Sequence, residues 1–328
     1  MKILVYDVAA QSGGALTVLH EAYQYAAQHR EIEWKFILSA AKLESRDNIL
    51  VENYPDIKKS WFHRYRFDKI TAPRIVQKFK PDIVLNLQNI CISCKCKQIL
   101  YMHQPLPFAG YRFSVKDRKM WIYQNIIGRM IKRSCKRADE IIVQTQWIKN
   151  AIVRQCKVPE CKISVRPPKI DAASLKTFCA TEKNCYFYPA SASVYKNHAV
   201  IVDACIRLKQ VGFSEYKIMF TLQGNENEHI RKLYEKCQTQ QLNIEWVGSL
   251  PRARVYELYG THGLIFPSYI ETFGLPLLEA KTAGSPILAS DTEFSHEICD
   301  GYSCVKFFTF NDSERLARLI QNFGDKSS

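Results

Sequence analysis

The chain has 328 residues, of which 47% are hydrophobic, and a formal net charge of +14. This length suits two domains of ordinary size, and the apolar fraction is sufficient for two cores. The sequence has no run of about 18 apolar residues, which excludes a membrane-spanning helix of the usual kind. The apolar run within residues 1–7 is too short for a signal peptide. We therefore expect the 12 cysteines to be reduced thiols of a cytoplasmic protein.

Apolar strands and amphipathic helices alternate along the first half of the chain, which is typical of an α/β fold with a parallel sheet. We expect strands at residues 3–6, 34–38, 83–87, 98–102, 140–144 and 163–166. Helices are expected at residues 16–28, 70–79, 121–137 and 147–155. Pro167, Pro168 and the polar stretch after them break this alternation. We therefore predict a first domain at residues 1–168 and a linker at residues 169–181.

A second series of strands and helices follows the linker and predicts a second domain at residues 182–328. Its expected strands are residues 185–188, 216–222, 244–247, 264–266 and 286–289. Its expected helices are residues 197–212, 229–239, 252–259 and 313–322, together with one that begins at Pro276. The predicted fold class is α/β, with two Rossmann-like domains in tandem. Because ligands of such sheets bind at the carboxyl ends of the strands, we expect a site in a cleft between the domains.

The most informative segment, residues 266–291, has the pattern of a strand, a polar loop, a helix, a turn and a second strand. The loop carries Glu271, and the helix carries Glu279. The residues between them that lead into the helix are Thr272, Phe273, Gly274, Leu275 and Pro276. Glycine lets a ligand approach the backbone, and the free amide groups at a helix start attract an anion. A phosphate bound there would lie between two carboxylates, which can accept hydrogen bonds from hydroxyl groups of the ligand. A ligand with an anionic centre and hydroxyl-rich ends is a nucleotide sugar.

This segment resembles the Glu-x7-Glu signature of the retaining glycosyltransferases of family 4, and Glu271 and Glu279 stand at its two glutamate positions. The family has the GT-B fold, in which two Rossmann-like domains face each other across a cleft. The resemblance implies transfer of a sugar from a nucleotide-diphosphate donor to an acceptor hydroxyl, with retention at the anomeric carbon. It covers most of the chain and is strongest over residues 185–300.

Further segments of the second domain resemble donor-binding parts of the family. Lys196, followed by Asn197, matches a lysine that holds the donor diphosphate, although the arginine that precedes it in the family is absent here. Gly224 stands in a turn that resembles the one facing the nucleotide. Val247 belongs to a segment that resembles the one whose backbone contacts the base.

Two segments of the first domain also resemble parts of the family. Gly13 and Gly14 follow the first strand and resemble a glycine loop near the diphosphate. A simple strand-to-helix turn is the alternative for them. His103 follows a buried strand and resembles a histidine that contacts the transferred sugar near the reacting carbon. A structural histidine is the alternative there.

The resemblance implies a division of roles. The catalytic residues would be Glu271, which binds donor-sugar hydroxyls, His103, which orients the sugar, and Lys196, which stabilises the leaving diphosphate. Glu279 would bind the ribose. No Asp-x-Asp motif stands in a suitable loop, so we expect neither a metal nor a cofactor. The donor-binding set implied by the resemblance is Gly13, Gly14, Lys196, Asn197, Gly224, Val247, Glu271, Thr272, Phe273, Gly274, Leu275 and Glu279.

The positive charge is concentrated between Lys58 and Arg137, where aromatic residues are interleaved with it. Such a surface suits the anionic face of a membrane, with aromatic rings at the level of the headgroups. We therefore expect a peripheral protein at the inner face of the cytoplasmic membrane and a glycan acceptor carried by a lipid, as in the synthesis of surface polysaccharides. A solvated face is the alternative, and nucleic acid is the less favoured partner.

Two other functions remain open at this point. A GT-B scaffold without activity would bind its ligand only, and the arginine missing before Lys196 favours this alternative. A nucleotide-sugar hydrolase or epimerase could use the same fold. Cys91, Cys94 and Cys96 could suggest a metal site, but no second Cys or His pair follows them at zinc-site spacing.

Overall fold

The computed structural model describes residues 1–11, 13–180 and 183–322. The chain divides into two compact units, unit 1 (Met1–Pro167) and unit 2 (Pro168–Ser328). In this division, the residues predicted as a linker belong to unit 2, and the linker itself and the roles of the two domains stay predictions. Ser12 of the predicted glycine loop, Thr181 of the predicted linker, and Glu182 and residues 323–328 of the predicted second domain lie outside the described residues.

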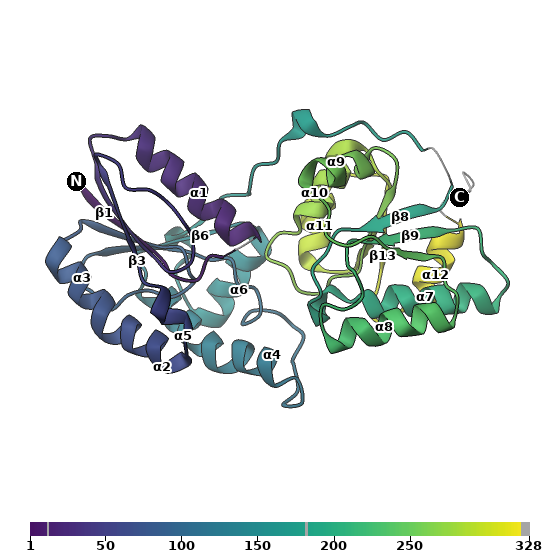
Figure 1. The fold of residues 1–328 in the computed structure, drawn as a ribbon, viewed down its shortest axis with the longest axis horizontal. Coiled ribbons are helices and arrows are strands. Elements are labelled where there is room, and N and C mark those ends of the chain that lie inside the picture. The colour runs from purple at the N-terminus through teal and green to yellow at the C-terminus, as the bar shows by residue number, and fades with distance from the viewer. Residues whose placement is uncertain (12, 181–182, 323–328) are drawn as a thin grey trace. The chain divides into compact units, whose positions relative to one another are not determined.

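Unit 1 is built on a parallel sheet that has seven strands within the described residues, in the order β3-β2-β1-β4-β5-β6-β7. The strands are β1 (Lys2–Asp7), β2 (Glu33–Leu38), β3 (Ile49–Asn53), β4 (Ile83–Asn86), β5 (Lys97–Tyr101), β6 (Glu140–Val143) and β7 (Ile163–Val165). The main helices are α1 (Gly13–Gln28), α3 (Ala72–Phe79), α5 (Gly128–Arg137) and α6 (Gln146–Cys156). Figure 1 shows α1 on one face of this sheet and α3 and α5 on the other.

The central strands of unit 1 are hydrophobic throughout because both of their faces are covered. Alternate residues of β1 enter different cores. Val5 packs in a cluster with Leu19 and Tyr23 of α1, whereas Leu4 lies in a cluster with Val76 of α3. This double burial explains why the first strand was readable from the sequence as a continuous apolar run.

The region between β2 and β4 is more regular than the sequence analysis indicated. Strand β3 was not predicted, and the helix expected at residues 70–79 begins earlier. It starts with α2 (Trp61–Arg66), continues through a π-helical turn, η2 (Phe67–Thr71), and ends with α3. Ser60 caps this helical stretch by accepting a hydrogen bond from the backbone N–H of His63, at 3.3 Å. The start was missed because aromatic residues on the exposed side of α2 hide the helical period of apolar residues.

Unit 2 is built on a second parallel sheet, which has six strands within the described residues in the order β10-β9-β8-β11-β12-β13. The strands are β8 (Cys185–Tyr188), β9 (Lys217–Phe220), β10 (Ile244–Trp246), β11 (Gly263–Phe266), β12 (Ile287–Ser290) and β13 (Val305–Phe308). The helices are α7 (His198–Gln210), α8 (Glu228–Thr239), α9 (Arg252–Tyr259), α10 (Leu275–Ala283), α11 (Glu293–Cys299) and α12 (Ser313–Asn322). Of these elements, α11 and β13 were not predicted from the sequence.

In unit 2, α7 and α8 cover one face of the sheet and α9, α10 and α11 the other (Figure 1). Helix α12 returns to pack on α7. The two parallel sheets with helices on both faces confirm the predicted α/β class with two Rossmann-like domains. Within the described parts of the chain, every helix is too short or too polar to cross a bilayer.

Candidate functional site

The predicted site residues of unit 2 gather at one edge of its sheet. Because all its strands are parallel, their carboxyl ends lie together, and ligands of open α/β sheets bind at this edge. Lys196 and Asn197 follow β8, Gly224 follows β9, and Val247 follows β10. Glu271 and the start of α10 follow β11. The topology therefore brings together residues that are far apart in the sequence.

Lys196 and Glu271 form an ion pair between Lys196 Nζ and Glu271 Oε1. Their side chains retain only 18% and 15% of their exposure, so the pair is largely shielded from solvent. The hydroxyl of Ser268, which is fully buried, donates a second hydrogen bond to Glu271 Oε1 at 2.8 Å. The family resemblance implied that Lys196 binds the diphosphate and Glu271 the sugar, and the structure shows that the two side chains form a pair.

Asn197 connects three segments of the edge. Its φ of 60° lies in the left-handed region, which asparagine tolerates better than most residues. Its side-chain amide donates to the carbonyl of Pro267 at 3.3 Å and to the carbonyl of Phe310 at 2.6 Å. Asn197 therefore ties the loop after β8 to the loops after β11 and β13, and this bracing holds Lys196 in position.

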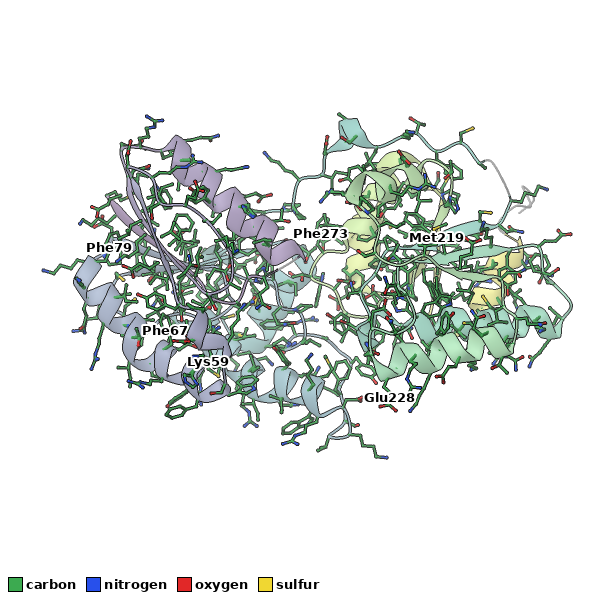
Figure 2. The ribbon with its side chains drawn as sticks, viewed as in Figure 1. Lys59, Phe67, Phe79, Met219, Glu228 and Phe273 are labelled. Atoms are coloured by element: carbon green, nitrogen blue, oxygen red, sulfur yellow. The ribbon has the colours of Figure 1, made fainter. Side chains whose placement is uncertain are left out.

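Helix α10 begins at Leu275, one residue before the predicted start at Pro276. Gly274 is its N-cap and has a φ of 94°, which only glycine adopts readily. A Cβ at this position would also lie 3.3 Å from Leu277 Cδ1. Thr272 and Phe273 form the rest of the loop, and Phe273, labelled in Figure 2, is buried. The backbone conformation and the close packing thus favour glycine here, whether or not a ligand approaches.

Glu279 lies one turn further along α10 and is buried, with 7% of its surface exposed. Tyr259 donates its hydroxyl to Glu279 Oε2 at 2.9 Å, and Arg252 Nη2 lies 3.4 Å from Oε1. Burial raises the pKa of Glu279, and the hydrogen bond from Tyr259 and the charge of Arg252 oppose that rise. Arg252 and Tyr259 were not predicted as site residues from the sequence. Their spacing on α9, which puts them two turns apart on one helix face, was the available signal.

A pocket of about 590 Å³ opens at the same edge, a volume in the range of small-ligand sites. Its walls come from the loops after β8, β9 and β10 and from α9: Pro189, Ala190, Ser191, Ala192, Thr221, Leu222, Gln223, Glu226, Ser249, Leu250 and Val255. Glu226 was not predicted. Its carboxylate accepts hydrogen bonds from the backbone N–H groups of Gln223 at 2.5 Å and Gly224 at 3.1 Å, which fixes the turn after β9.

Two of the predicted donor residues stand beside this pocket. Gly224 has a φ of 94°, and a Cβ there would lie 2.5 Å from the ring of Tyr234, so the turn admits glycine only. Val247 donates its backbone N–H to the carbonyl of Phe220 at 3.0 Å, while its side chain is 39% exposed. The backbone geometry thus explains why residue 224 is a glycine. The exposed side chain near the pocket is that of Val247.

In unit 1, Gly13 and Gly14 are the first residues of α1. A Cβ at Gly14 would meet no described heavy atom within 4 Å, so the space beside this glycine is open. His103 lies two residues after β5, and its backbone N–H donates to Asn89 Oδ1 at 2.7 Å. Burial lowers the pKa of His103 to about 4, so its imidazole is neutral at neutral pH.

The end of β1 carries an ionisable residue that the sequence analysis did not select. Asp7 is buried, and its Oδ1 accepts hydrogen bonds from the backbone N–H groups of Ala9 at 3.2 Å and Ala10 at 3.0 Å. Burial raises the pKa of Asp7 to about 6, against the lowering effect of those hydrogen bonds and of Arg64. An acid between an apolar strand and a glycine loop was the signal in the sequence.

The cysteine group of unit 1 does not converge on one point. Cys91 Sγ lies 3.7 Å from the carbonyl of Ser134, whereas Cys94 and Cys96 have their sulfur atoms 3.1 Å apart. Over the described ranges, no three His, Cys, Asp or Glu side chains are grouped so that they could hold a metal ion.

Comparison with known families identifies the class of protein to which these features belong. A model of the family "Glycosyltransferase Family 4" matches residues 12–174, and a model of "Glycosyl transferases group 1" matches residues 171–327. The two models together span nearly the whole chain. The chain therefore belongs to the glycosyltransferases that these two models describe, family 4 and group 1, and the protein is a glycosyltransferase.

A curated relative and two solved structures illustrate the similarity. The O-antigen chain mannosyltransferase RfbU of Salmonella typhimurium is 24% identical over 287 residues, which cover 80% of this chain and 78% of that protein. Sucrose-phosphate synthase from Thermosynechococcus elongatus has a TM-score of 0.75 at 14% identity, covering 99% of this chain and 90% of that one. Alr3699/HepE of Anabaena, in complex with UDP and glucose, has a TM-score of 0.72 at 16% identity, with coverage of 99% and 90%. The predicted GT-B fold is thereby confirmed.

Proposed function

We propose that this glycosyltransferase moves a sugar from a nucleotide-diphosphate donor to an acceptor hydroxyl with retention at the anomeric carbon. The observation that carries the proposal is the ion pair between Lys196 and Glu271 at the start of α10. A cation, a carboxylate and a helix N-terminus in one place suit a ligand with an anionic centre and a hydroxyl-rich end. The complex of HepE with UDP and glucose adds support, because that protein shares the fold.

The main chemical task is to stabilise the negative charge that develops on the departing diphosphate. Lys196 is paired with Glu271 in the structure. We propose that the donor separates this pair, so that Lys196 turns to the diphosphate and Glu271 accepts hydrogen bonds from the sugar hydroxyls. The backbone N–H groups of Phe273 to Leu275 and the positive end of the α10 dipole would add to the stabilisation.

The bond changes balance without any further reactant. The bond between the anomeric carbon and the phosphate oxygen breaks, and a bond to the acceptor oxygen forms on the same face of the sugar. The departing phosphate oxygen takes the proton of the acceptor hydroxyl. A short-lived covalent intermediate is the other route to retention. We propose that His103 orients the sugar as a neutral hydrogen-bonding group, which agrees with its lowered pKa of about 4.

Glu279 is proposed to bind the ribose of the donor. Its carboxylate is already held by Tyr259 and Arg252, so it would meet the ligand in a fixed orientation. The nucleotide would lie toward the pocket of about 590 Å³ beside Gly224 and Val247. No metal or cofactor is part of this proposal, because Lys196 and the α10 N-terminus supply the positive charge.

We propose that the acceptor is a glycan carried by a lipid and that the protein acts in surface-polysaccharide synthesis, as a peripheral protein at the inner face of the cytoplasmic membrane. The similarity to RfbU, an O-antigen chain mannosyltransferase, supports this assignment. The basic and aromatic residues of unit 1 support binding to a membrane that contains anionic lipids.

The test is to incubate the purified protein with UDP-, GDP- and dTDP-sugars, with and without EDTA. Thermal stability and the slow release of nucleotide diphosphate are measured. We expect one donor to stabilise the fold and to be hydrolysed slowly, at a rate that EDTA does not change. Lys196→Ala should lose most of the stabilisation. Loss of donor hydrolysis in EDTA would contradict metal independence.

The pair also gives the silent-scaffold alternative a specific basis, because Lys196 already has a carboxylate partner and the preceding arginine is absent. A protein that binds a donor but never releases the diphosphate, with or without acceptor, would support that alternative. Release of free sugar as the sole product in the presence of acceptors would instead indicate a hydrolase.

A further inference from the structure

Unit 1 exposes three aromatic side chains on one short helix. Trp61, Phe62 and Tyr65 of α2 retain 67%, 70% and 60% of their exposure. Large aromatic rings are among the side chains that gain most from burial, so three exposed together require an explanation. We call these residues the aromatic ridge.

The ridge is not a displaced part of the core, because the same helical stretch already has a buried side. Phe67, labelled in Figure 2, is buried and stacks on Tyr6 at a ring-centroid distance of 6.4 Å. Its ring also packs against Tyr54 at 4.8 Å. In a helix, residues 61, 62 and 65 lie within an arc of about 100° on one side, while residue 67 points to another side. The stretch therefore has one aromatic side that packs in the core and a second aromatic side that is exposed.

Positive charges accompany the ridge. Lys58, Lys59, Arg66 and Lys69 are exposed in or beside α2. Lys59 is paired with Asp56 at 2.6 Å, whereas neither Arg66 nor Lys69 has an ion-pair partner among the described residues. Exposed lysines and arginines next to exposed rings are the side chains expected at an anionic bilayer surface, where rings enter the headgroup region and cations meet phosphates.

The neighbouring part of the same face has a similar character. Helix α4 (Arg118–Ile122) lies on the same side of the unit 1 sheet as α2 in Figure 1. The segment before it exposes Val115 at 72%, between the exposed residues Arg112 and Lys116. A nucleic acid strand is usually held in a positively charged groove that tracks its backbone. Here the rings protrude from a helix, which favours a flat lipid surface.

We propose that the aromatic ridge of α2 enters the headgroup layer of an anionic bilayer, with Arg66 and Lys69 contacting lipid phosphates. The inference deepens the proposed role at a membrane by naming the residues that enter it. It does not depend on which sugar is transferred. Because α2 is one segment of unit 1, docking through it would hold unit 1 at the lipid surface.

The first test measures binding of the full-length protein to vesicles by flotation. Vesicles of phosphatidylcholine alone are compared with vesicles that contain about one third phosphatidylglycerol, an anionic lipid. The triple variant Trp61→Ala/Phe62→Ala/Tyr65→Ala should bind the anionic vesicles at least roughly tenfold more weakly, because membrane affinity scales with the apolar area that enters. Arg66→Gln and Lys69→Gln should each cost roughly fivefold near an anionic surface.

Matched controls distinguish binding through this surface from non-specific adsorption to vesicles. Tyr25→Ala removes an aromatic ring that is 53% exposed on α1, on the opposite face of the sheet in Figure 1, and should leave binding unchanged. Arg30→Gln with Lys306→Gln removes two exposed cations elsewhere and should have a small effect. Trp61 fluorescence reports insertion directly: a blue shift on addition of anionic vesicles should disappear in Trp61→Phe, which still binds.

Each outcome decides the proposal. Wild-type binding by the triple variant, or no binding of the wild-type protein to anionic vesicles, would overturn it. Ridge-dependent retention on a single-stranded oligonucleotide without vesicle binding would overturn it in favour of nucleic acid. Donor hydrolysis is measured without vesicles in the same variants and should not change. If the wild-type protein never hydrolyses a donor but binds vesicles through the ridge, only the proposed function fails.

Discussion

The carboxyl edges of the two sheets differ in how their ionisable groups are compensated. In unit 2, Glu271 is paired with Lys196, and Tyr259 and Arg252 contact Glu279 and oppose the effect of burial, which raises its pKa. In unit 1, burial shifts Asp7 and His103 toward their neutral forms, with pKa values of about 6 and about 4. An ion pair beside a helix N-terminus suits an anionic ligand, whereas an edge whose buried groups are shifted toward neutrality suits an uncharged, hydroxyl-bearing one.

The largest expected effect tests the charged edge. Glu271→Gln keeps an oxygen that accepts from Ser268 but removes the charge opposite Lys196, and we expect the transfer rate to fall by roughly 10² to 10³. Turnover with the identified donor measures it. The control is Glu245→Gln, which should retain the rate. Glu245 is an exposed residue of β10 that pairs with Lys217 of β9. Wild-type turnover in Glu271→Gln would refute the role of the pair.

The next effect tests the neutral edge through pH. The pKa of Asp7 is raised from 3.8 to about 6. Between these two pH values, Asp7 is protonated in the folded protein and ionised in the unfolded chain. The stability contributed by this proton is present below about pH 4 and is lost as pH rises through about 6. Relative to wild type, Asp7→Asn should therefore gain up to about 3 kcal/mol in the free energy of unfolding between these pH values.

Chemical denaturation of the two proteins from pH 4 to pH 7 measures the Asp7 effect, and only the difference between them is interpreted. Both proteins share their other titrating groups, so acid unfolding common to both cancels. If the difference in the free energy of unfolding does not change with pH, the pKa of Asp7 is not raised. The two edges would then be more alike than the geometry indicates.

A smaller effect tests the turn beside the unit 2 pocket. Gly224→Ala places a Cβ 2.5 Å from the ring of Tyr234 at a φ of 94°. We expect a loss of about 2 to 3 kcal/mol in the free energy of unfolding from strain and overpacking. Gly284→Ala also has a positive φ, 81°, but open space around its Cβ, so it should cost only about 1 kcal/mol. Equal losses would mean that the Tyr234 ring moves freely.

The smallest effect concerns the support of Glu279. Arg252→Ala removes a long contact of 3.4 Å to Glu279 but leaves the hydrogen bond from Tyr259. We expect the KM for the donor to rise about tenfold at most, with little change in kcat, since the ribose contact is made equally in the bound and reacting states. Steady-state kinetics measure it, with Arg254→Ala, whose guanidinium pairs with Glu257, as the control. A change confined to kcat would place Glu279 nearer to the reacting bond.

How far the sequence predicted the site depends on whether its residues are contiguous. Residues 271–279 lie in one strand-loop-helix segment, so their pattern was visible, and the helix start was placed within one residue. Arg252 and Tyr259 share a face of α9, but this spacing does not reveal that their side chains reach Glu279 on α10. Glu226 accepts hydrogen bonds from the backbone of its own turn, and an acidic residue in a turn is too common to mark such a role. In the fold, β3, α2, α11 and β13 were missed, because their apolar residues lack a clear period or lie in short runs.

The sequence by itself determined the α/β class, most of the strands and the Glu271 to Glu279 segment. These follow from local apolar periodicity, glycine and proline placement and a contiguous motif. Only the tertiary structure decided that Lys196 meets Glu271 across 75 residues, that Asp7 and His103 are driven toward neutrality, and that Trp61, Phe62 and Tyr65 face outward. The physical reason is that pairing, desolvation and exposure depend on what packs around a side chain, and that environment is assembled from distant parts of the chain.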